Sequence, residues 1–458
     1  MAGISVENSA PTEPAQERQP LAHEQPAPSQ RQRLMQAMID VVGEQGYAKT
    51  TVAHVIARAG VSRKSFYQHF ANKQACLLET YDAITAQAVA HVTEAYLRER
   101  DTVASARAGI DALFGWAIEH PRALRLVLME VGSTGPAGIE RRERLLGRFE
   151  ELLRVGLQLP PGPNPVLRAV IGGLNQVLYT RAQASRYGEL SGLVPVLVGW
   201  ATSYYPVPAV MMRLQERPAP APPHAPALLA GGRAPGTLFA HLGTAERRGL
   251  VGERASVSRS LVVHSQRERI LDAVANLTSE RGYANVTCES IAEAAAVSLQ
   301  AFYTHFTGKE DAFLVAYEVG HHKSLAAVQR GRLSAPDWQR GVREGIRALF
   351  EFLASEPAFA HMALVDALIA THRTAERSAK GAAAYARMLA PAAREAMPAP
   401  AARETALAAR PPGVLLEAIT GGLFELCFSQ ALRGRVRTLP ELLPAATYFA
   451  LAPFIGAE

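Results

Sequence analysis

Apolar side chains recur along this chain at intervals of three and four residues, and runs of alternating apolar and polar positions are missing. The first spacing places side chains on one face of a helix, whereas a strand with one buried face needs alternation. Glycine and hydroxyl residues, which favour the ends of helices, separate the apolar stripes. The pattern therefore predicts an all-α fold.

The pattern occurs twice. Residues 30–81 align with residues 266–317 at a constant offset of 236, without a gap and with 19 identities in 52 positions. Further along, the offset becomes 249, where Gly172 aligns with Gly421 and Pro195 with Pro444. Repetition of this extent indicates two structural units of the same type. We call the earlier unit copy 1 and the later unit copy 2.

A tight turn between two short helices is predicted in each copy. In copy 1 the turn lies between Ala59 and the capping residue Ser62, with Gly60 at its centre. Glycine readily adopts the left-handed backbone conformation that such a turn requires, and two helices joined in this way form a helix-turn-helix. The helix after the turn would bury Phe66 and Phe70 and expose a cationic, polar face, which can donate hydrogen bonds to phosphates and base edges.

Composition and charge indicate a polyanionic partner, either a nucleic acid or an anionic surface. The net charge of +6 and the pI near 9.3 indicate contact with a polyanion. The cysteines Cys76, Cys288 and Cys427 lie far apart, which argues against a disulfide framework or a zinc site and favours the reducing cytoplasm. No phosphate loop, HExxH or GxSxG motif is present, so we expect no catalytic residue, metal or cofactor, and no enzyme.

One uncharged segment, residues 190–212, is long enough to cross a membrane. Prolines interrupt it at three positions, and we therefore expect a helix buried against a partner subunit rather than a membrane span.

From Gly46 to Lys73 the chain resembles the tetracycline-repressor (TetR) family of transcription regulators, in the sequence GYAKTTVAHVIARAGVSRKSFYQHFANK. A looser match, GYANVTCESIAEAAAVSLQAFYTHFTGK, runs from Gly282 to Lys309. The resemblance implies two tandem DNA-binding regulators in one chain, each with a helix-turn-helix head and a helical domain that receives a small-molecule effector and forms dimers. It also implies double-stranded operator DNA as the partner, and a repressor.

The resemblance implies roles for individual residues of the heads. In copy 1, Arg63, Lys64 and Tyr67 would meet bases, and Thr51, Ser65, Gln68, His69 and Lys73 would hold phosphates. The corresponding DNA-binding positions of copy 2 are Thr287, Gln300, Tyr303, Thr304, His305 and Lys309.

Copy 2 departs from the pattern at the positions that should meet DNA. Ala296 replaces the turn glycine, and Leu299 and Gln300 replace Arg63 and Lys64. Residues 30–81 hold seven Lys or Arg against three Asp or Glu, whereas residues 266–317 hold four against seven. Because phosphate attraction dominates sequence-independent affinity, copy 2 should bind DNA more weakly than copy 1, or not at all alone.

The expected domains follow from the repeat and from a segment rich in proline, alanine and glycine between the copies, which a flexible chain would span over about 40 Å. They are a disordered tail (1–29), the first helix-turn-helix head (30–75), the first effector and dimerisation domain (76–212), a linker (213–263), the second, degenerate head (264–311) and the second effector and dimerisation domain (312–458). Four closing helices could form a bundle across the pseudo-twofold axis.

Several alternatives stay open. The two copies either pair within one chain as a pseudo-dimer, or copy 1 pairs with copy 1 of another chain in a homodimer. A protein-interaction module with vestigial heads is the alternative to a DNA-binding regulator. The effector is unidentified. Five aromatic and methionine side chains could line its cavity or the core: Trp116, Met129, Tyr179, Phe352 and Met362. We expect four histidines to be exposed to solvent by default: His120, His321, His322 and His361.

Overall fold

The computed structural model describes residues 28–205, 259–396 and 412–455. Within these ranges all regular structure is helical, which confirms the all-α prediction. The predicted tail lies outside the described residues except for its last two, and so does the predicted linker up to residue 258. Residues 259–263, the last five of the predicted linker, instead form the start of a helix. The last proline before them is Pro235, so no proline opposes a helix at these positions.

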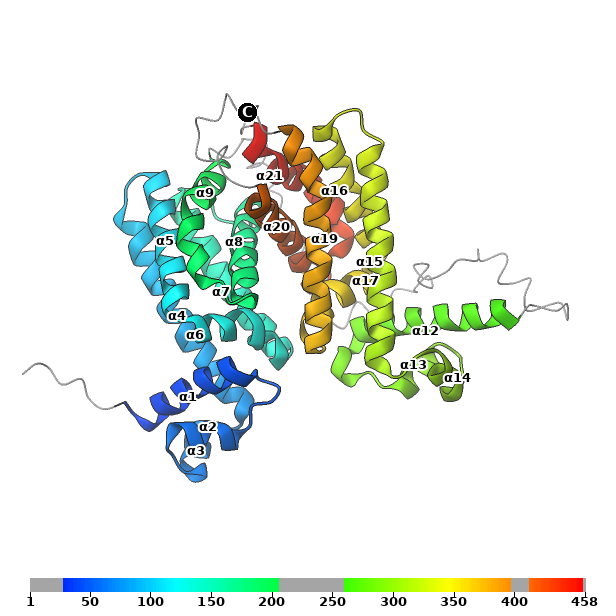
Figure 1. Cartoon of the computed structure of the whole chain (residues 1–458), viewed down its shortest axis with the longest axis horizontal. Coiled ribbons are helices and arrows are strands. Elements are labelled where there is room, and N and C mark those ends of the chain that lie inside the picture. The colour runs from blue at the N-terminus through cyan, green and yellow to red at the C-terminus, as the bar shows by residue number, and fades with distance from the viewer. Residues whose placement is uncertain (1–27, 206–258, 397–411, 456–458) are drawn as a thin grey trace, which may run out of the picture.

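Copy 1 begins with the three helices of its head and continues into the helical body (Figure 1). Its elements are α1 (Gln30–Gln45), α2 (Val52–Ala59), α3 (Arg63–His69), α4 (Lys73–Arg98), α5 (Thr102–Glu119), α6 (Pro121–Arg125), the π-helix η1 (Leu126–Glu130), the 3-10 helix η2 (Val131–Thr134), α7 (Pro136–Gly156), α8 (Pro165–Gln183), η3 (Tyr187–Glu189) and α9 (Leu190–Thr202).

Copy 2 repeats this order. Its elements are α12 (Arg259–Arg281), η5 (Tyr283–Asn285), α13 (Cys288–Ala294), α14 (Leu299–His305), α15 (Lys309–Leu333), α16 (Trp338–Ser355), α17 (Pro357–His361), the π-helix η6 (Met362–Asp366), α18 (Ala367–Ile369), α19 (His372–Ala396), α20 (Pro412–Leu432), η8 (Val436–Leu442) and α21 (Leu443–Ile455). The offset of 236 carries α5 onto α16 and π-helix η1 onto π-helix η6, residue for residue.

The predicted apolar stripes form the cores. Phe66 and Phe70 of copy 1 are 0 % and 2 % exposed, and Phe302 and Phe306 of copy 2 are 0 % and 3 % exposed. The stripe on α5 is buried at Ile110, Phe114 and Ala117, and its counterpart on α16 is buried as well. The two heads lie at the same end of the molecule, on opposite sides of the helical body (Figure 1).

The two copies pack against each other through their closing helices. Helix α8 runs along α20, while α21 also contacts α8 and α20 contacts α9. Trp200 on α9 is fully buried and stacks edge-on against Phe449 of α21. In the described part of the uncharged segment, residues 190–205, helix α9 is therefore buried as expected, but against the second half of the same chain.

Among the described residues, one helix is long and apolar enough to cross a membrane by composition, Gly413–Leu432. It is α20 at the junction of the two copies, and 83% of its apolar window is buried inside the protein. A second candidate arises only if α16 and the helices after it are joined, and that pair is bent by 106°. The burial of α20 fits a core helix.

Candidate DNA-binding interface

Side-chain hydrogen bonds cap the helices of the first head, which we call head 1 (residues 30–75). The Thr51 hydroxyl accepts the backbone N–H of His54 at 3.2 Å and so caps α2. Gly60 ends α2 with φ of 63° and ψ of 41°, the left-handed conformation that its sequence position predicts. Ser62 then caps α3 by accepting the N–H of Ser65 at 3.1 Å. The helix-turn-helix is thus specified by local hydrogen bonds as well as by burial.

The outer face of α3 is cationic and aromatic. Arg63, Lys64, Gln68 and His69 are exposed, and the Tyr67 side chain is 48% exposed. The guanidinium of Arg63 lies 5.9 Å from the centre of the Tyr67 ring. These groups can donate hydrogen bonds to base edges and phosphates without any rearrangement of the buried residues beneath them.

Ser65 is the exception among the predicted site residues of α3. Its side chain is 7% exposed, and its hydroxyl donates a hydrogen bond to Oε1 of Gln30 on α1. The prediction that Ser65 holds a phosphate is corrected, because position 65 lies on the buried side of α3 beside Phe66. Ser65 instead ties α3 to the start of α1.

Lys73 has a structural role that the sequence did not reveal. Its ammonium donates hydrogen bonds to the carbonyl oxygens of Tyr47 and Thr50 at 3.0 and 2.8 Å, and it lies 4.0 Å from the centre of the Tyr47 ring. Burial lowers the pKa of this ammonium. Two of its three N–H donors are occupied, so one is left for the predicted phosphate.

The second head, head 2 (residues 264–311), repeats the geometry with different chemistry. Thr287 forms a capping box with Ser290, and Lys309 donates to the carbonyls of Tyr283 and Val286 at 3.1 and 2.9 Å. Ala296 occupies the turn with φ of 51°, so the left-handed backbone persists without glycine. Such a conformation costs a residue with a Cβ about 1–2 kcal/mol.

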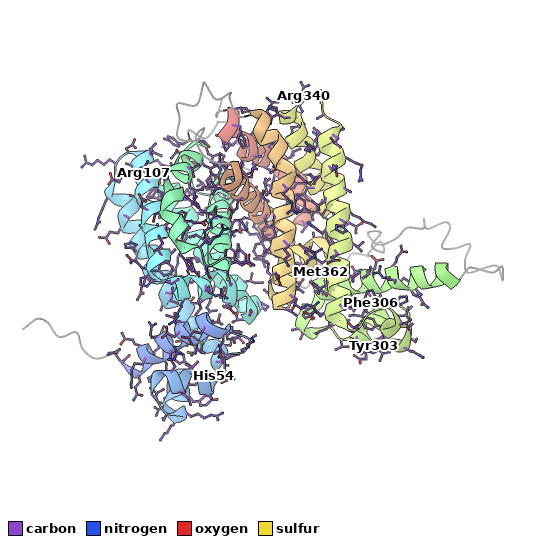
Figure 2. All side chains as sticks on the ribbon, viewed as in Figure 1. His54, Arg107, Tyr303, Phe306, Arg340 and Met362 are labelled. Atoms are coloured by element: carbon purple, nitrogen blue, oxygen red, sulfur yellow. The ribbon has the colours of Figure 1, made fainter. Side chains whose placement is uncertain are left out.

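The outer face of α14 carries no cation among its own residues. Gln300, Thr304 and Tyr303 are exposed, with Tyr303 at the rim of the head (Figure 2), and Leu299 stands where copy 1 has Arg63. His305 is half-buried, and its Nε2 lies 3.5 Å from Oε1 of Gln266. Burial and the nearby Arg267 lower the pKa of His305.

Glu130 is a functional candidate that the sequence reasoning missed. Its carboxylate, at the end of η1 in the body, accepts the backbone N–H of Tyr47 in head 1 at 2.9 Å. The corresponding residue of copy 2, Asp366, instead contacts Nδ1 of His361 at 2.9 Å. The sequence signal was an acidic residue at the same position of both copies, Glu130 and Asp366. It could not reveal the contact with Tyr47, which lies 83 residues earlier in the chain.

The histidines of copy 2 differ from expectation. His321 is 8% exposed, and its ring stacks on Tyr317. Burial, the neighbouring His322 and Arg377 lower the pKa of His321 to about 4. The default of solvated histidines is therefore wrong for His321, and His361 is paired with Asp366. In the described part of the chain no three His, Cys, Asp or Glu side chains gather as a metal site would require.

An exposed cationic face on the second helix of a helix-turn-helix defines a DNA-binding protein. A family model for bacterial regulatory proteins of the tetR family matches residues 34–80 and again residues 270–316. No curated protein matches the chain. The chain therefore carries the N-terminal domain of the TetR family twice. It is a DNA-binding transcription regulator.

Solved structures of TetR family regulators match part of this chain. The fatty acid degradation regulator FadR from Bacillus halodurans is 15% identical with a TM-score of 0.34, and the match covers 38% of this chain and 97% of that chain. A TetR family transcription regulator from Marinobacter aquaeolei VT8 is 22% identical with a TM-score of 0.32, over 38% of this chain and 93% of that chain.

Proposed function

We propose that the chain is a repressor whose operator is read mainly by head 1 and released when a small molecule binds in the helical body. The observation that carries this proposal is the outer face of α3, where Arg63, Lys64 and Tyr67 stand exposed above a buried aromatic core. The contacts proposed for head 1 are Arg63, Lys64 and Tyr67 to bases and Thr51, Gln68, His69 and Lys73 to phosphates. Head 2 adds weaker contacts through Thr287, Gln300, Tyr303, Thr304, His305 and Lys309.

The two copies act as a pseudo-dimer in this proposal. Packing of α8 on α20 within one chain supports it, as do heads at the same end of the body. Helix-turn-helix dimers read half-sites about 34–36 Å apart or at a multiple of that distance. Because the two heads differ in charge, the operator should be asymmetric.

Selection of bound sites from random duplex DNA tests the function. We expect one strongly determined half-site, contributed by head 1, and a second half-site of weak preference at a fixed spacing. Failure to enrich any sequence, with no retention on nonspecific duplex at low salt, would favour the protein-interaction module instead. A symmetric site with two strong halves would contradict the pseudo-dimer and favour pairing of copy 1 with copy 1.

Two cavities in the helical body support control by a small molecule. The cavity of copy 1, about 120 Å³, is lined by α4, α5, η1, α7 and α8, and its walls include Trp116, Val127 and Leu128. Of the other aromatic and methionine candidates, Tyr179 faces a separate depression, whereas Met362 is fully buried in the core. A cavity with such apolar walls fits a small apolar effector of about the size of benzene.

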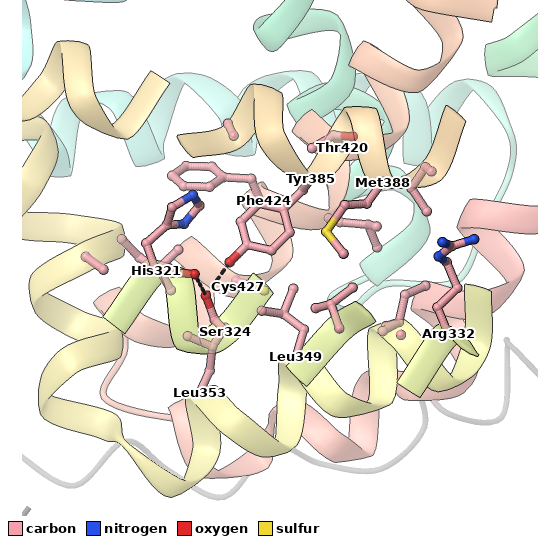
Figure 3. Close-up of a pocket in the computed structure, with 18 of the residues that line it drawn as sticks. His321, Ser324, Arg332, Leu349, Leu353, Tyr385, Met388, Thr420, Phe424 and Cys427 are labelled. Carbon is pink, nitrogen blue, oxygen red and sulfur yellow. Dashed lines mark hydrogen bonds between the residues drawn. The ribbon is translucent and has the colours of Figure 1, made fainter. Parts of the chain in front are cut away.

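The cavity of copy 2, about 110 Å³, is more polar (Figure 3). The hydroxyls of Ser324 and Tyr385 are 2.6 Å apart in its wall, beside His321. The Thr420 hydroxyl is buried without a hydrogen-bond partner, and Arg332 lies toward the other end. Its ligand should therefore carry a polar group that the copy 1 ligand lacks.

Helix η1 provides a route from the first cavity to head 1. Val127 and Leu128 line the cavity, and Glu130 on the same π-helical turn holds the N–H of Tyr47. An occupant that displaces η1 would therefore shift the loop that precedes α2. The coupling of such sites is typically 1–3 kcal/mol.

Benzene, used as a probe, tests this route. It should weaken binding of the selected operator by about fivefold or more in the wild type, and less in a Glu130→Leu variant that has lost the acceptor. Equal weakening in both proteins would exclude Glu130 from the coupling.

A further inference from the structure

The junction between the copies has an internal twofold symmetry that can be followed residue by residue. A Cβ on Gly172 would lie 2.3 Å from Cβ of Glu425, and a Cβ on Gly421 would lie 2.3 Å from Cβ of Gln176. Since the offset here is 249, Gly421 corresponds to Gly172 and Glu425 to Gln176. The contact of Gly172 with Glu425 thus has an equivalent contact in which the two copies are exchanged. The same offset predicts which side chains would face each other if copy 1 paired with copy 1, or copy 2 with copy 2.

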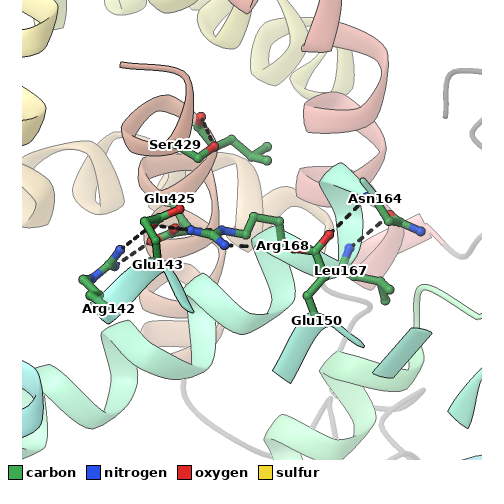
Figure 4. Close-up of polar contacts among 9 residues, drawn as sticks. Arg142, Glu143, Glu150, Asn164, Leu167, Arg168, Glu425 and Ser429 are labelled. Atoms are coloured by element: carbon green, nitrogen blue, oxygen red, sulfur yellow. Dashed lines mark hydrogen bonds and ion pairs between the residues drawn. The ribbon is translucent and has the colours of Figure 1, made fainter. Parts of the chain in front are cut away.

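Copy 1 contributes arginines to the centre of the junction, and copy 2 contributes the carboxylate that they share (Figure 4). Arg168 Nε donates to Glu425 Oε1 at 2.8 Å, and Arg142 Nη2 donates to Glu425 Oε2 at 2.7 Å. The Glu425 and Arg168 side chains are 2% and 6% exposed. Burial alone would raise the pKa of Glu425, but the two guanidinium groups outweigh it and the pKa is lowered.

A second ion pair crosses the same junction. Arg181 Nη1 of α8 donates to Glu417 Oε2 of α20 at 2.5 Å, and the two side chains are 10% and 18% exposed. Arginine therefore comes from copy 1 and glutamate from copy 2 in both pairs. A buried ion pair of this kind loses its favourable energy, and incurs repulsion, when either partner changes sign.

Pairing copy 1 with a second copy 1 would remove both carboxylates. By the offset of 249, the position of Glu417 is occupied by Arg168 and that of Glu425 by Gln176. Arg181 would then face Arg168 of the other copy, twice in a symmetric dimer, and Arg168 would face an uncharged amide. Glu143 of its own copy would still contact Arg168, but no carboxylate would come from across the junction.

Pairing copy 2 with copy 2 would fail for the opposite reason. Glu417 stands at the position of Arg168, so Glu417 would face Glu425 of the other copy. Two carboxylates at a buried contact cannot both stay ionised at neutral pH without a large penalty. Both like pairings therefore bring like charges together, and the mixed pairing alone neutralises them.

We propose that Arg142, Arg168 and Arg181 against Glu417 and Glu425 form a charge code that restricts the closing helices of copy 1 to those of copy 2, and that the copy 2 of the same chain is the partner. Covalent linkage favours the partner in the same chain, because it raises the effective concentration of one copy for the other. This code goes beyond the proposed repressor function and does not depend on DNA.

Charge reversal of the second ion pair tests the code in the full chain. In R181E two carboxylates face each other, in E417R two guanidinium groups do, and in R181E/E417R the pair is restored with opposite polarity. Each single change should favour separation of the copies by at least about a hundredfold, and the double variant should recover most of this loss. Hydrogen exchange of the α8 and α20 amides measures the separation. The control is R98E at the exposed end of α4, which should behave as wild type.

Mixing the two single variants gives an independent readout. The substituted α8 of an R181E chain can pair with the substituted α20 of an E417R chain, while the second junction between the two chains keeps Arg181 and Glu417. The mixture should therefore form a species of twice 49.2 kDa by light scattering, whereas the wild type and the double variant should remain at 49.2 kDa.

Three results would overturn the charge code. The first is unchanged exchange in both single variants, and the second is a double variant as open as the single ones. The third is a wild-type dimer in which chemical cross-links join copy 1 to copy 1. Should a single variant fail to fold, recovery of folding in the double variant supports the code, and its continued failure to fold counts against it.

Discussion

Heads 1 and 2 have the same backbone and opposite surfaces. Both bury two phenylalanines under the second helix of the helix-turn-helix, and both cap that helix with serine. In both, a lysine also donates to two carbonyls of the loop before the first helix of the helix-turn-helix. Head 1 exposes Arg63 and Lys64, while head 2 exposes Leu299 and Gln300. The residues that maintain the fold are thus the same in both copies, whereas Arg63, Lys64 and Gln68, three of those proposed to meet DNA, are replaced in copy 2. The two heads therefore share a fold and differ in the chemistry of their outer faces.

The largest effect expected from this comparison concerns DNA affinity. The R63A/K64A variant should lose about a hundredfold or more in affinity for duplex DNA, and its dependence on salt should flatten, because two cations no longer displace counterions. The matched control is L299A/Q300A in head 2, which should change affinity little. Fluorescence anisotropy over a range of salt concentrations measures both. Equal losses in the two variants would mean that the heads contribute equally.

A second difference between the copies concerns acid stability. His321 in the cavity of copy 2 corresponds to Thr85 in copy 1, so only copy 2 has a buried imidazole there. Its pKa of about 4 lies below the ordinary value of 6.5, so the unfolded chain binds the proton more strongly. The contribution of neutral, buried His321 to the stability of the folded protein is therefore fully present above pH 6.5 and is lost as the pH falls toward 4.

Replacing His321 with glutamine should flatten this dependence. Between pH 6.5 and 4 the thermal midpoint of the wild type should fall by several degrees more than that of H321Q, followed by circular dichroism. The matched T85S change in copy 1 should leave the pH dependence as it is. Parallel curves for wild type and H321Q would show that His321 does not titrate in this range.

The sequence predicted the heads better than the body for a physical reason. Caps, the turn at Gly60 and the aromatic pair Phe66 and Phe70 act within a few residues, so their spacing is visible in the sequence. The contact between Glu130 and Tyr47, and the ion pairs of Glu425, join segments far apart in the chain. Ser65 was misassigned because the resemblance gives a position a role without showing which way its side chain points.

The lysine that binds two loop carbonyls in each head allows support of the fold to be distinguished from DNA contact. Replacing Lys73 or Lys309 with methionine removes two charge-assisted hydrogen bonds to carbonyls, and each should lower the free energy of unfolding of its head by about 1.5–3 kcal/mol. Urea denaturation measures this loss. If Lys73 also holds a phosphate, K73M should weaken DNA binding well beyond K309M at a temperature where both heads are folded. Equal DNA affinities of K73M and K309M would show that Lys73 supports the loop and does not contact a phosphate.

The smallest expected effect lies in the turn, where the two heads share a left-handed backbone but differ in residue. Ala296 at φ of 51° bears the strain that Gly60 at φ of 63° avoids. A296G should therefore stabilise head 2 by about 0.5–1 kcal/mol, once the greater freedom of glycine in the unfolded chain is subtracted. The reverse change, G60A, should destabilise head 1 by a similar amount, since its Cβ would meet nothing closer than Arg33 Nη1 at 4.0 Å. Urea denaturation of both variants tests the pair. If A296G left stability unchanged or lowered it, strain in this turn could not account for the difference between the heads, and the lost cations of head 2 would be its principal departure from head 1.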